Sequence, residues 1–261
     1  MMICRCKFLF TIFLCILIIN SCKREKYGNL VLHFSHTVDS QPVQFDQLIY
    51  TNAAGNQYQV NEVKYFISNF YLIDSEGEFE KIYKNDGIHY VDCSLPQTLN
   101  WNINKIRHKK YTAISFIFGL NENDNISNSF VNPPESNFSW PEVLGGGYHY
   151  LQINGKFLNK NNEISNLNIH TGIGQIKDEN NVIFVHNYIF ITLPIVFSIE
   201  ENQTTFLTLN MDIQRWFDTP NLYNFDDFSN GIMQNQYAQQ LLKENGKNVF
   251  EFILNSSEAP N

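Results

Sequence analysis

Residues 144–159 read LGGGYHYLQINGKFLN, and residues 168–172 read NIHTG. The alternation of polar and apolar residues predicts one β-strand that carries His149, Leu151 and Ile153 and another over residues 164–170, because successive side chains of a strand point to opposite faces. The glycines at 145–147 allow the backbone to approach neighbouring groups closely. Two of the seven histidines and one of the three tryptophans lie between residues 138 and 172. If the protein binds a metal, we expect the metal here.

Simple alternation places the two histidines of this stretch on different faces. His149 shares a face with the apolar residues Leu151 and Ile153, whereas His170 lies on the polar side of its strand. The two rings meet only if a bulge or a turn near Gly172 changes the phase at the strand ends. The pattern leaves both arrangements open.

The rest of the chain predicts more strands and a single helix. The 22 Phe and 13 Tyr favour strands, and the spacing of apolar residues predicts a helix over 232–242. The fold class that follows is all-β, an antiparallel β-sandwich with one short helix in the C-terminal region. Further strands are predicted at residues 29–36, 63–73, 87–93, 111–119, 182–194, 206–213 and 249–254.

The polar segment 121–139 predicts a long irregular loop, because Pro133 and Pro134 interrupt regular structure. A loop of this length is often functional. We expect it to deliver Trp140 to the surface or the rim of the sandwich.

Charge and motifs exclude several classes of protein. The formal net charge is −8, and the body of the chain has no basic cluster, which argues against a nucleic-acid partner. The sequence contains no Walker A loop, G-x-S-x-G elbow, H-E-x-x-H pair or C-x-x-C site. Since no nucleophile–base pair or carboxylate pair is identifiable either, we expect no enzyme.

The N-terminus predicts a bacterial lipoprotein signal over residues 1–21. Arg5 and Lys7 precede an apolar run at 8–19, and Cys22 follows a small residue. Cleavage before Cys22 leaves a lipidated cysteine that inserts in a bilayer. The alternative is an ordinary signal peptide with a chance cysteine.

One domain over residues 28–254 is predicted, after a tether at 22–27 and before a polar tail at 255–261, because no linker divides the chain. Only Cys93 of the five cysteines lies in that domain, so its core must hold it together without a disulfide. Cys93 is typical of a small buried hydrophobic residue, and the alternative is a soft metal ligand.

Several segments of the chain resemble the MbnP-like family. They include Trp140 with residues 144–159 and 168–172, the NAAG turn followed by KYFISN within residues 52–69, and a strand that leads to the pair Trp216 and Phe217. The resemblance covers most of the chain after the signal segment. Members of this family are bacterial copper-associated proteins, often lipoproteins, and are named after a methanobactin partner.

Three histidines are candidate copper ligands: His36, His149 and His170. They lie on three separate predicted strands, and imidazole is the natural donor here because thiolates are absent apart from Cys93. The resemblance supports the same set. His36 matches the histidine at the end of the first strand, His149 the residue after Gly-Tyr, and His170 the His-x-Gly element. A histidine at the end of a buried strand face is also typical of a hydrogen-bonded core residue, which is the alternative for His36.

The resemblance also implies a role for Trp140. In some members a diheme, MauG-like cytochrome oxidises the matching tryptophan to kynurenine, which then contributes to the metal site. This chain departs from the family pattern by the glycine-rich insertion before Tyr148. The alternative is a rim aromatic that covers the core.

Two functions follow as hypotheses. The first is a lipoprotein of the cell envelope that binds copper through histidines, for copper acquisition or handling. It is anchored by Cys22 in the outer membrane, on the periplasmic or the surface face. The second is a metal-free β-sandwich binding module that presents the loop at 121–147 to a glycan or a protein.

Overall fold

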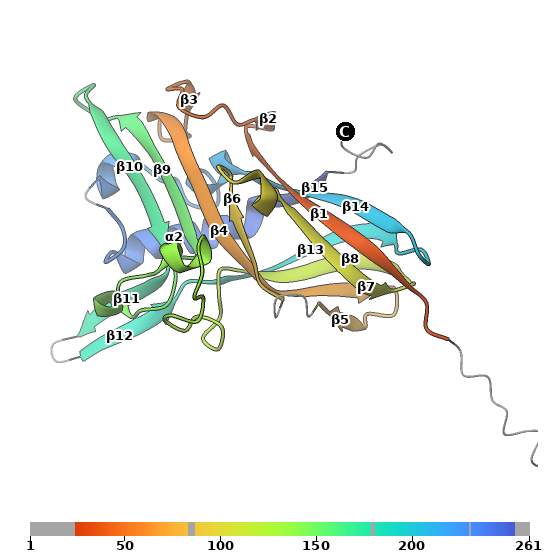
Figure 1. Ribbon diagram of the computed structural model, residues 1–261. Coiled ribbons are helices and arrows are strands. Elements are labelled where there is room, and N and C mark those ends of the chain that lie inside the picture. The colour runs from red at the N-terminus through yellow and green to blue at the C-terminus, as the bar shows by residue number, and fades with distance from the viewer. Residues whose placement is uncertain (1–23, 83–86, 179–180, 230, 254–261) are drawn as a thin grey trace, which may run out of the picture.

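The computed structural model describes residues 24–82, 87–178, 181–229 and 231–253. The predicted signal segment, the lipidation site Cys22 and the tail at 255–261 lie outside these residues. Two β-sheets form a sandwich around one main core (Figure 1), which confirms the all-β class. None of the helices in the described part of the chain is long and apolar enough to cross a membrane.

The larger sheet is built around β4 (Gln57–Asp74), which pairs with five other strands. Its principal strand order is β10-β9-β4-β8-β13, and all of its pairs are antiparallel. The other strands of this sheet are β3 (Tyr50–Thr51), β5 (Phe79–Lys81), β6 (His89–Asp92), β8 (Lys110–Phe118), β9 (Leu151–Leu158), β10 (Ile164–Thr171) and β13 (Ile189–Ser198).

The smaller sheet has the order β15-β14-β1-β2, with β7 paired to β1. The pair of β1 and β14 is parallel, which differs from the wholly antiparallel prediction. Parallel neighbours need a long connection, and the chain between these two strands builds the whole larger sheet. The alternation of polar and apolar residues does not show whether two neighbouring strands run parallel or antiparallel. The strands are β1 (Tyr27–Val38), β2 (Gln41–Pro42), β7 (Asn100–Arg107), β14 (Thr204–Asp212) and β15 (Phe250–Ile253).

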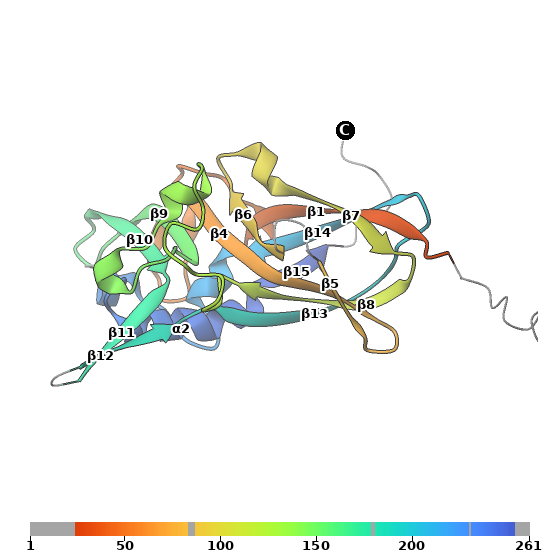
Figure 2. The ribbon, with the colours of Figure 1, turned by 60° about the horizontal axis from the view of Figure 1, so that its bottom comes forward.

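A separate hairpin of β11 (Ile173–Asp178) and β12 (Asn181–His186) projects from one end of the molecule (Figure 2). The single strand predicted at 182–194 is therefore wrong, since the chain leaves β12 and enters β13 after two residues. The break falls at Asn187, whose buried side chain donates to the carbonyl oxygen of Gly172 instead of facing solvent. An uninterrupted β pattern does not reveal such a turn.

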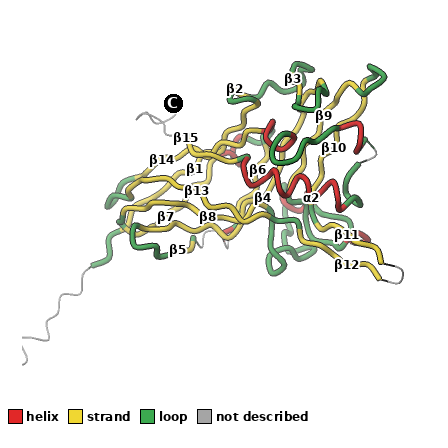
Figure 3. Tube along the Cα trace, turned by 180° about the vertical axis from the view of Figure 1, so that it is seen from behind, coloured by secondary structure: helices red, strands yellow, loops and turns green. Residues whose placement is uncertain are grey.

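The helix α2 (Gln236–Asn245) lies at the end of the molecule that carries β9 to β12 (Figure 3). It starts four residues later than predicted, because the side chain of Asn235 caps it by accepting from the backbone N–H of Ala238. The 3₁₀ helices are η2 (Pro96–Leu99), η3 (Glu135–Phe138), η4 (Glu142–Leu144), η5 (Ile213–Phe217), η6 (Phe225–Phe228) and η7 (Gly246–Asn248).

The strand β4 is buried on both faces. Its Tyr65 lies in the main core between the sheets, whereas Phe66 points to the other face. A bulge at Asn69, whose φ is 48°, then shifts the register with β8. The loop over 121–139 covers the outer face of the sheet and closes an outer aromatic cluster of Phe66, Tyr90, Leu120, Phe138, Tyr148 and Tyr150.

Candidate metal centre

The structure brings His149 and His170 together. Their ring centroids are 5.2 Å apart and their planes are inclined at 78°. His149 precedes the start of β9 at Leu151, and the backbone N–H of Tyr150 bonds to the carbonyl oxygen of Thr171. Because its ring also lies 5.0 Å from that of Phe138, a member of the outer aromatic cluster, His149 does not share the inner face of Leu151. Of the two arrangements that the sequence left open, the chain adopts the one with a change of phase.

Trp140 completes one side of this pair. Its ring lies edge-on to that of His149, at a centroid distance of 4.8 Å. Only 2% of Trp140 is exposed, so the loop does not present it at the surface. The reason lies in Gly172, where a Cβ atom would sit 2.7 Å from the indole ring. The missing side chain lets the ring pack directly onto the turn after His170.

His149 is held by a backbone carbonyl. Its Nδ1 lies 3.1 Å from the oxygen of Phe138. A carbonyl oxygen only accepts hydrogen bonds, so Nδ1 carries the proton and Nε2 keeps its lone pair. Burial lowers the pKa of His149, and the backbone hydrogen bonds to Phe138 and Ser139 oppose this in part. The ring is thus neutral at pH 7.

His170 is held by a side chain. Its Nε2 lies 2.8 Å from Oδ1 of Asn154, and the Nδ2 group of Asn154 donates to Glu62 at 2.9 Å. Burial, and then the nearby His149, lowers the pKa of His170 to about 4. This imidazole is also neutral at pH 7, which is the form that binds metals.

His36 lies elsewhere, on β1 of the smaller sheet, and its ring faces the core side of the larger sheet. Its Nε2 is 3.1 Å from the hydroxyl oxygen of Tyr65, and its Nδ1 is 3.3 Å from Sγ of Cys93. Burial lowers the pKa of His36 to about 3. Both ring nitrogens are occupied within the core, so the structure separates His36 from the other two candidates. The contacts of His36 are those of a hydrogen-bonded core histidine, the alternative interpretation of this residue.

Cys93 belongs to the same inner cluster. It is only partly exposed and packs against the main core, as expected of a small hydrophobic residue. Burial raises the pKa of its thiol to about 12, so the sulfur stays protonated at neutral pH. A protonated thiol is a poor metal ligand.

The described residues contain no group of three or more His, Cys, Asp or Glu side chains placed to hold a metal. Within the described residues, the candidate site consists of His149 and His170 beside Trp140. Sequence reasoning missed Asn154 and Glu62. They face each other across β9 and β4, and knowledge of that register is the signal that would have found them.

The other histidines bind to groups in their own surroundings. His33 contacts the side chain of Asn100, His108 lies 2.7 Å from the carbonyl oxygen of Ile199, and the His89 ring stacks on Trp101. None of these contacts involves His149 or His170.

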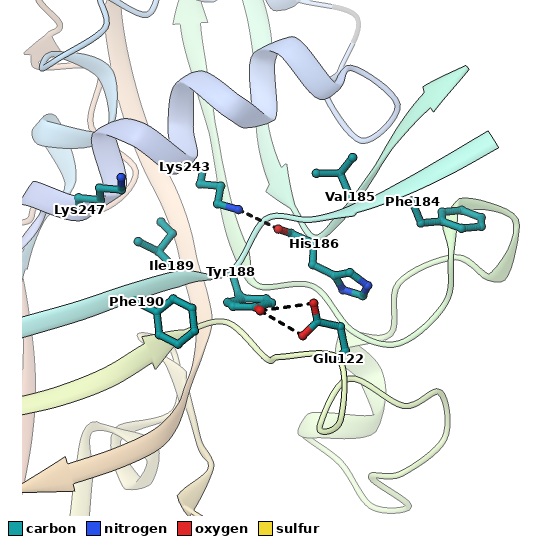
Figure 4. Close-up of a pocket in the computed structure, with 9 residues that line it drawn as sticks. All are labelled: Glu122, Phe184, Val185, His186, Tyr188, Ile189, Phe190, Lys243 and Lys247. Atoms are coloured by element: carbon teal, nitrogen blue, oxygen red, sulfur yellow. Dashed lines mark hydrogen bonds between the residues drawn. The ribbon is translucent and has the colours of Figure 1, made fainter. Parts of the chain in front are cut away.

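His186 lines a separate hollow of about 550 Å³ between β12, β13 and α2 (Figure 4). There the hydroxyl of Tyr188 donates to the carboxylate of Glu122, and Nζ of Lys243 donates to the His186 carbonyl oxygen at 2.8 Å. A second hollow, of about 540 Å³, lies under residues 129–135 of the long loop.

Comparison with known proteins agrees with the resemblance seen in the sequence. A solved structure, MbnP from Methylosinus trichosporium, is similar to this chain with a TM-score of 0.49 and 15% sequence identity, over 76% of this chain and 80% of that one. A comparison with curated protein sequences gave no match. The profile of the MbnP family matches residues 27–234, from the start of β1 to the segment before α2. The chain belongs to the MbnP family.

Proposed function

We propose that this protein binds copper through His149 and His170, for copper acquisition or handling. One observation carries the proposal. The ring centroids of two neutral imidazoles lie 5.2 Å apart, and each ring is held by an acceptor on one nitrogen, Nδ1 of His149 by the Phe138 carbonyl and Nε2 of His170 by Asn154. A ligating histidine typically donates its second ring N–H to a carbonyl or similar acceptor in this way.

The donor set favours copper over other metals. Imidazole suits copper, zinc, iron and nickel, whereas calcium and magnesium require oxygen ligands. Copper stands highest in the affinity order of the divalent metals for such nitrogen sites. The family to which the chain belongs supports the same choice. His149 and His170 would supply two ligands, and Trp140 lies against the first of them.

The cellular setting is part of the proposal. The signal segment supports a lipoprotein whose acylated Cys22 inserts in the bilayer of the cell envelope. We also propose that a MauG-like diheme cytochrome oxidises Trp140. Since the indole is buried, this partner would withdraw electrons through the protein rather than by direct contact with the ring. The activity proposed for the chain itself is binding, not catalysis.

Elemental analysis tests the proposal. The protein from residue 23 onward is purified from a copper-supplemented periplasm, beside the double variant His149→Ala/His170→Ala and the single variant His36→Ala. Near-stoichiometric copper is expected in the wild type and in folded His36→Ala, with none in the double variant. Equal copper in wild type and double variant would overturn the proposed site. A mass change at Trp140 in native-source material tests the oxidation separately.

A metal-free binding module is the second candidate. The hollow under residues 129–135 favours it, because the partly exposed ring of Phe130 lines it. Aromatic faces are suited to stack on the apolar faces of sugars. A glycan array with wild type and Phe130→Ala tests this function: binding that the variant loses supports it, and no binding contradicts it.

A further inference from the structure

We propose that Asn154, oriented by Glu62, is a positioning residue that makes Nδ1 of His170 the metal-binding nitrogen. His149 would bind through Nε2, so the two histidines would use different ring nitrogens. The ligand part of this inference rests on the proposed copper site. The hydrogen-bond part concerns the protein without metal.

Glu62 determines which way the amide of Asn154 points. The Nδ2 group of Asn154 lies 2.9 Å from Oε2 of Glu62. A carboxylate only accepts hydrogen bonds, so the donor end of the amide must face it. The acceptor Oδ1 is thereby directed at His170.

Asn154 in turn determines the tautomer of His170. Its Oδ1 lies 2.8 Å from Nε2 of the ring and cannot donate. Nε2 therefore carries the single proton of the neutral imidazole, and Nδ1 keeps the lone pair. Three adjacent strands, β4, β9 and β10, supply the three residues of this relay.

His149 shows the opposite tautomer for a different reason. Its Nδ1 faces a backbone carbonyl oxygen, so the lone pair is on Nε2. A backbone acceptor cannot be removed by substitution, whereas Asn154 can. The two histidines thus form an internal comparison in which only one tautomer depends on a side chain.

Lys64 lies beside the carboxylate end of the relay. Its Nζ lies 3.4 Å from Glu62 and 4.0 Å from Asp92, and only 21% of its side chain is exposed. The Glu62 carboxylate, one amide away from the imidazole, polarises the His170 ring and raises its basicity as a ligand.

Nitrogen NMR of the histidine rings in the metal-free protein tests the tautomers. We expect the Nε2–H form for His170 and the Nδ1–H form for His149. Asn154→Leu should give a mixture of tautomers at His170 and leave His149 unchanged. Glu62→Gln should preserve the Nε2–H form, because its side-chain oxygen still accepts from Asn154, whereas Glu62→Leu should not.

Copper titration tests the ligand part with the same proteins. Asn154→Leu is expected to weaken copper binding about 10- to 100-fold, the range for loss of a group that orients a metal ligand. Glu62→Gln should weaken it less. An Nδ1–H tautomer of His170 in the wild type would overturn the inference even if copper binds. Absence of copper binding in the wild type, with the expected tautomers, would instead overturn the proposed function.

Discussion

The two histidine environments on opposite faces of the larger sheet differ in how many ring nitrogens are occupied. On the core side, His36 has Tyr65 on one nitrogen and Cys93 on the other. On the outer side, His149 and His170 each have one hydrogen-bonded nitrogen and lie ring to ring. Burial lowers the pKa in all three.

A lowered pKa therefore does not by itself distinguish a ligand from a core residue. The number of hydrogen-bonded ring nitrogens does distinguish them. A histidine with partners on both nitrogens has no free lone pair for a metal, whereas a histidine with one acceptor can bind a metal through its other nitrogen. This distinction assigns His36 to the core and leaves His149 and His170 as the proposed metal ligands. Four predictions test this account of the two environments.

The largest effect is expected on copper affinity. His149→Ala/His170→Ala should weaken copper binding about 1,000-fold or more, equivalent to about 4 kcal/mol. Competition with a chromogenic chelator measures it. His36→Ala is the matched control, and an equal loss of affinity in that folded variant would contradict the division.

The next effect is on stability. His36→Ala should lower the free energy of unfolding by about 2–4 kcal/mol, because it leaves a cavity and an unpaired Tyr65 hydroxyl in the core. Urea denaturation measures this free energy. His33→Ala, on the opposite face of β1, is the control and should cost less than about 1 kcal/mol. Equal costs for the two variants would show that the inner contacts contribute little.

Gly172→Ala probes the packing beside the outer site. The added Cβ would lie 2.7 Å from the Trp140 ring, so we expect a loss of about 1–3 kcal/mol in stability and a changed near-ultraviolet spectrum of the indole. In the background of Trp140→Phe, where the ring is smaller, the same substitution should cost less. Additive costs in this double-mutant cycle would argue against the contact.

Low pH should lower the stability of the protein through His36. The unfolded chain protonates His36 with an ordinary pKa of 6.5, whereas the folded protein does so only near pH 3. The unfolded state thus binds more protons between these values, and stability falls as the pH is lowered, by about 1.4 kcal/mol per pH unit at most for this group. Urea denaturation at pH 7, 6, 5 and 4 should show a shallower dependence in His36→Ala. Parallel curves for both proteins would contradict this origin.

The fold class followed from the sequence because alternation is local. The strand predicted at 29–36 lies within β1, and the strand predicted at 111–119 overlaps β8 except for its last residue. β7 was missed, although Trp101 and Ile103 alternate with asparagines there. The parallel pairing of β1 with β14 was not predictable, since strand direction depends on contacts between segments about 170 residues apart.

The site was predictable in composition and not in geometry. The histidines and Trp140 were identified from residue type and resemblance. Which histidines lie close together depends on the change of strand phase before Leu151 and on the face to which His36 points. Both features are determined by the pairing of strands that are distant in sequence. The roles of Asn154 and Glu62 depend on the register between β9 and β4.

The most direct test is a titration of the nitrogen-labelled protein with Cu(I), which is diamagnetic, followed by NMR of the histidine rings. The account predicts that the unprotonated nitrogens of His149 and His170 shift together up to one equivalent, while the ring of His36 stays unchanged. A shift of the His36 ring nitrogens, with those of His149 and His170 unmoved, would contradict it.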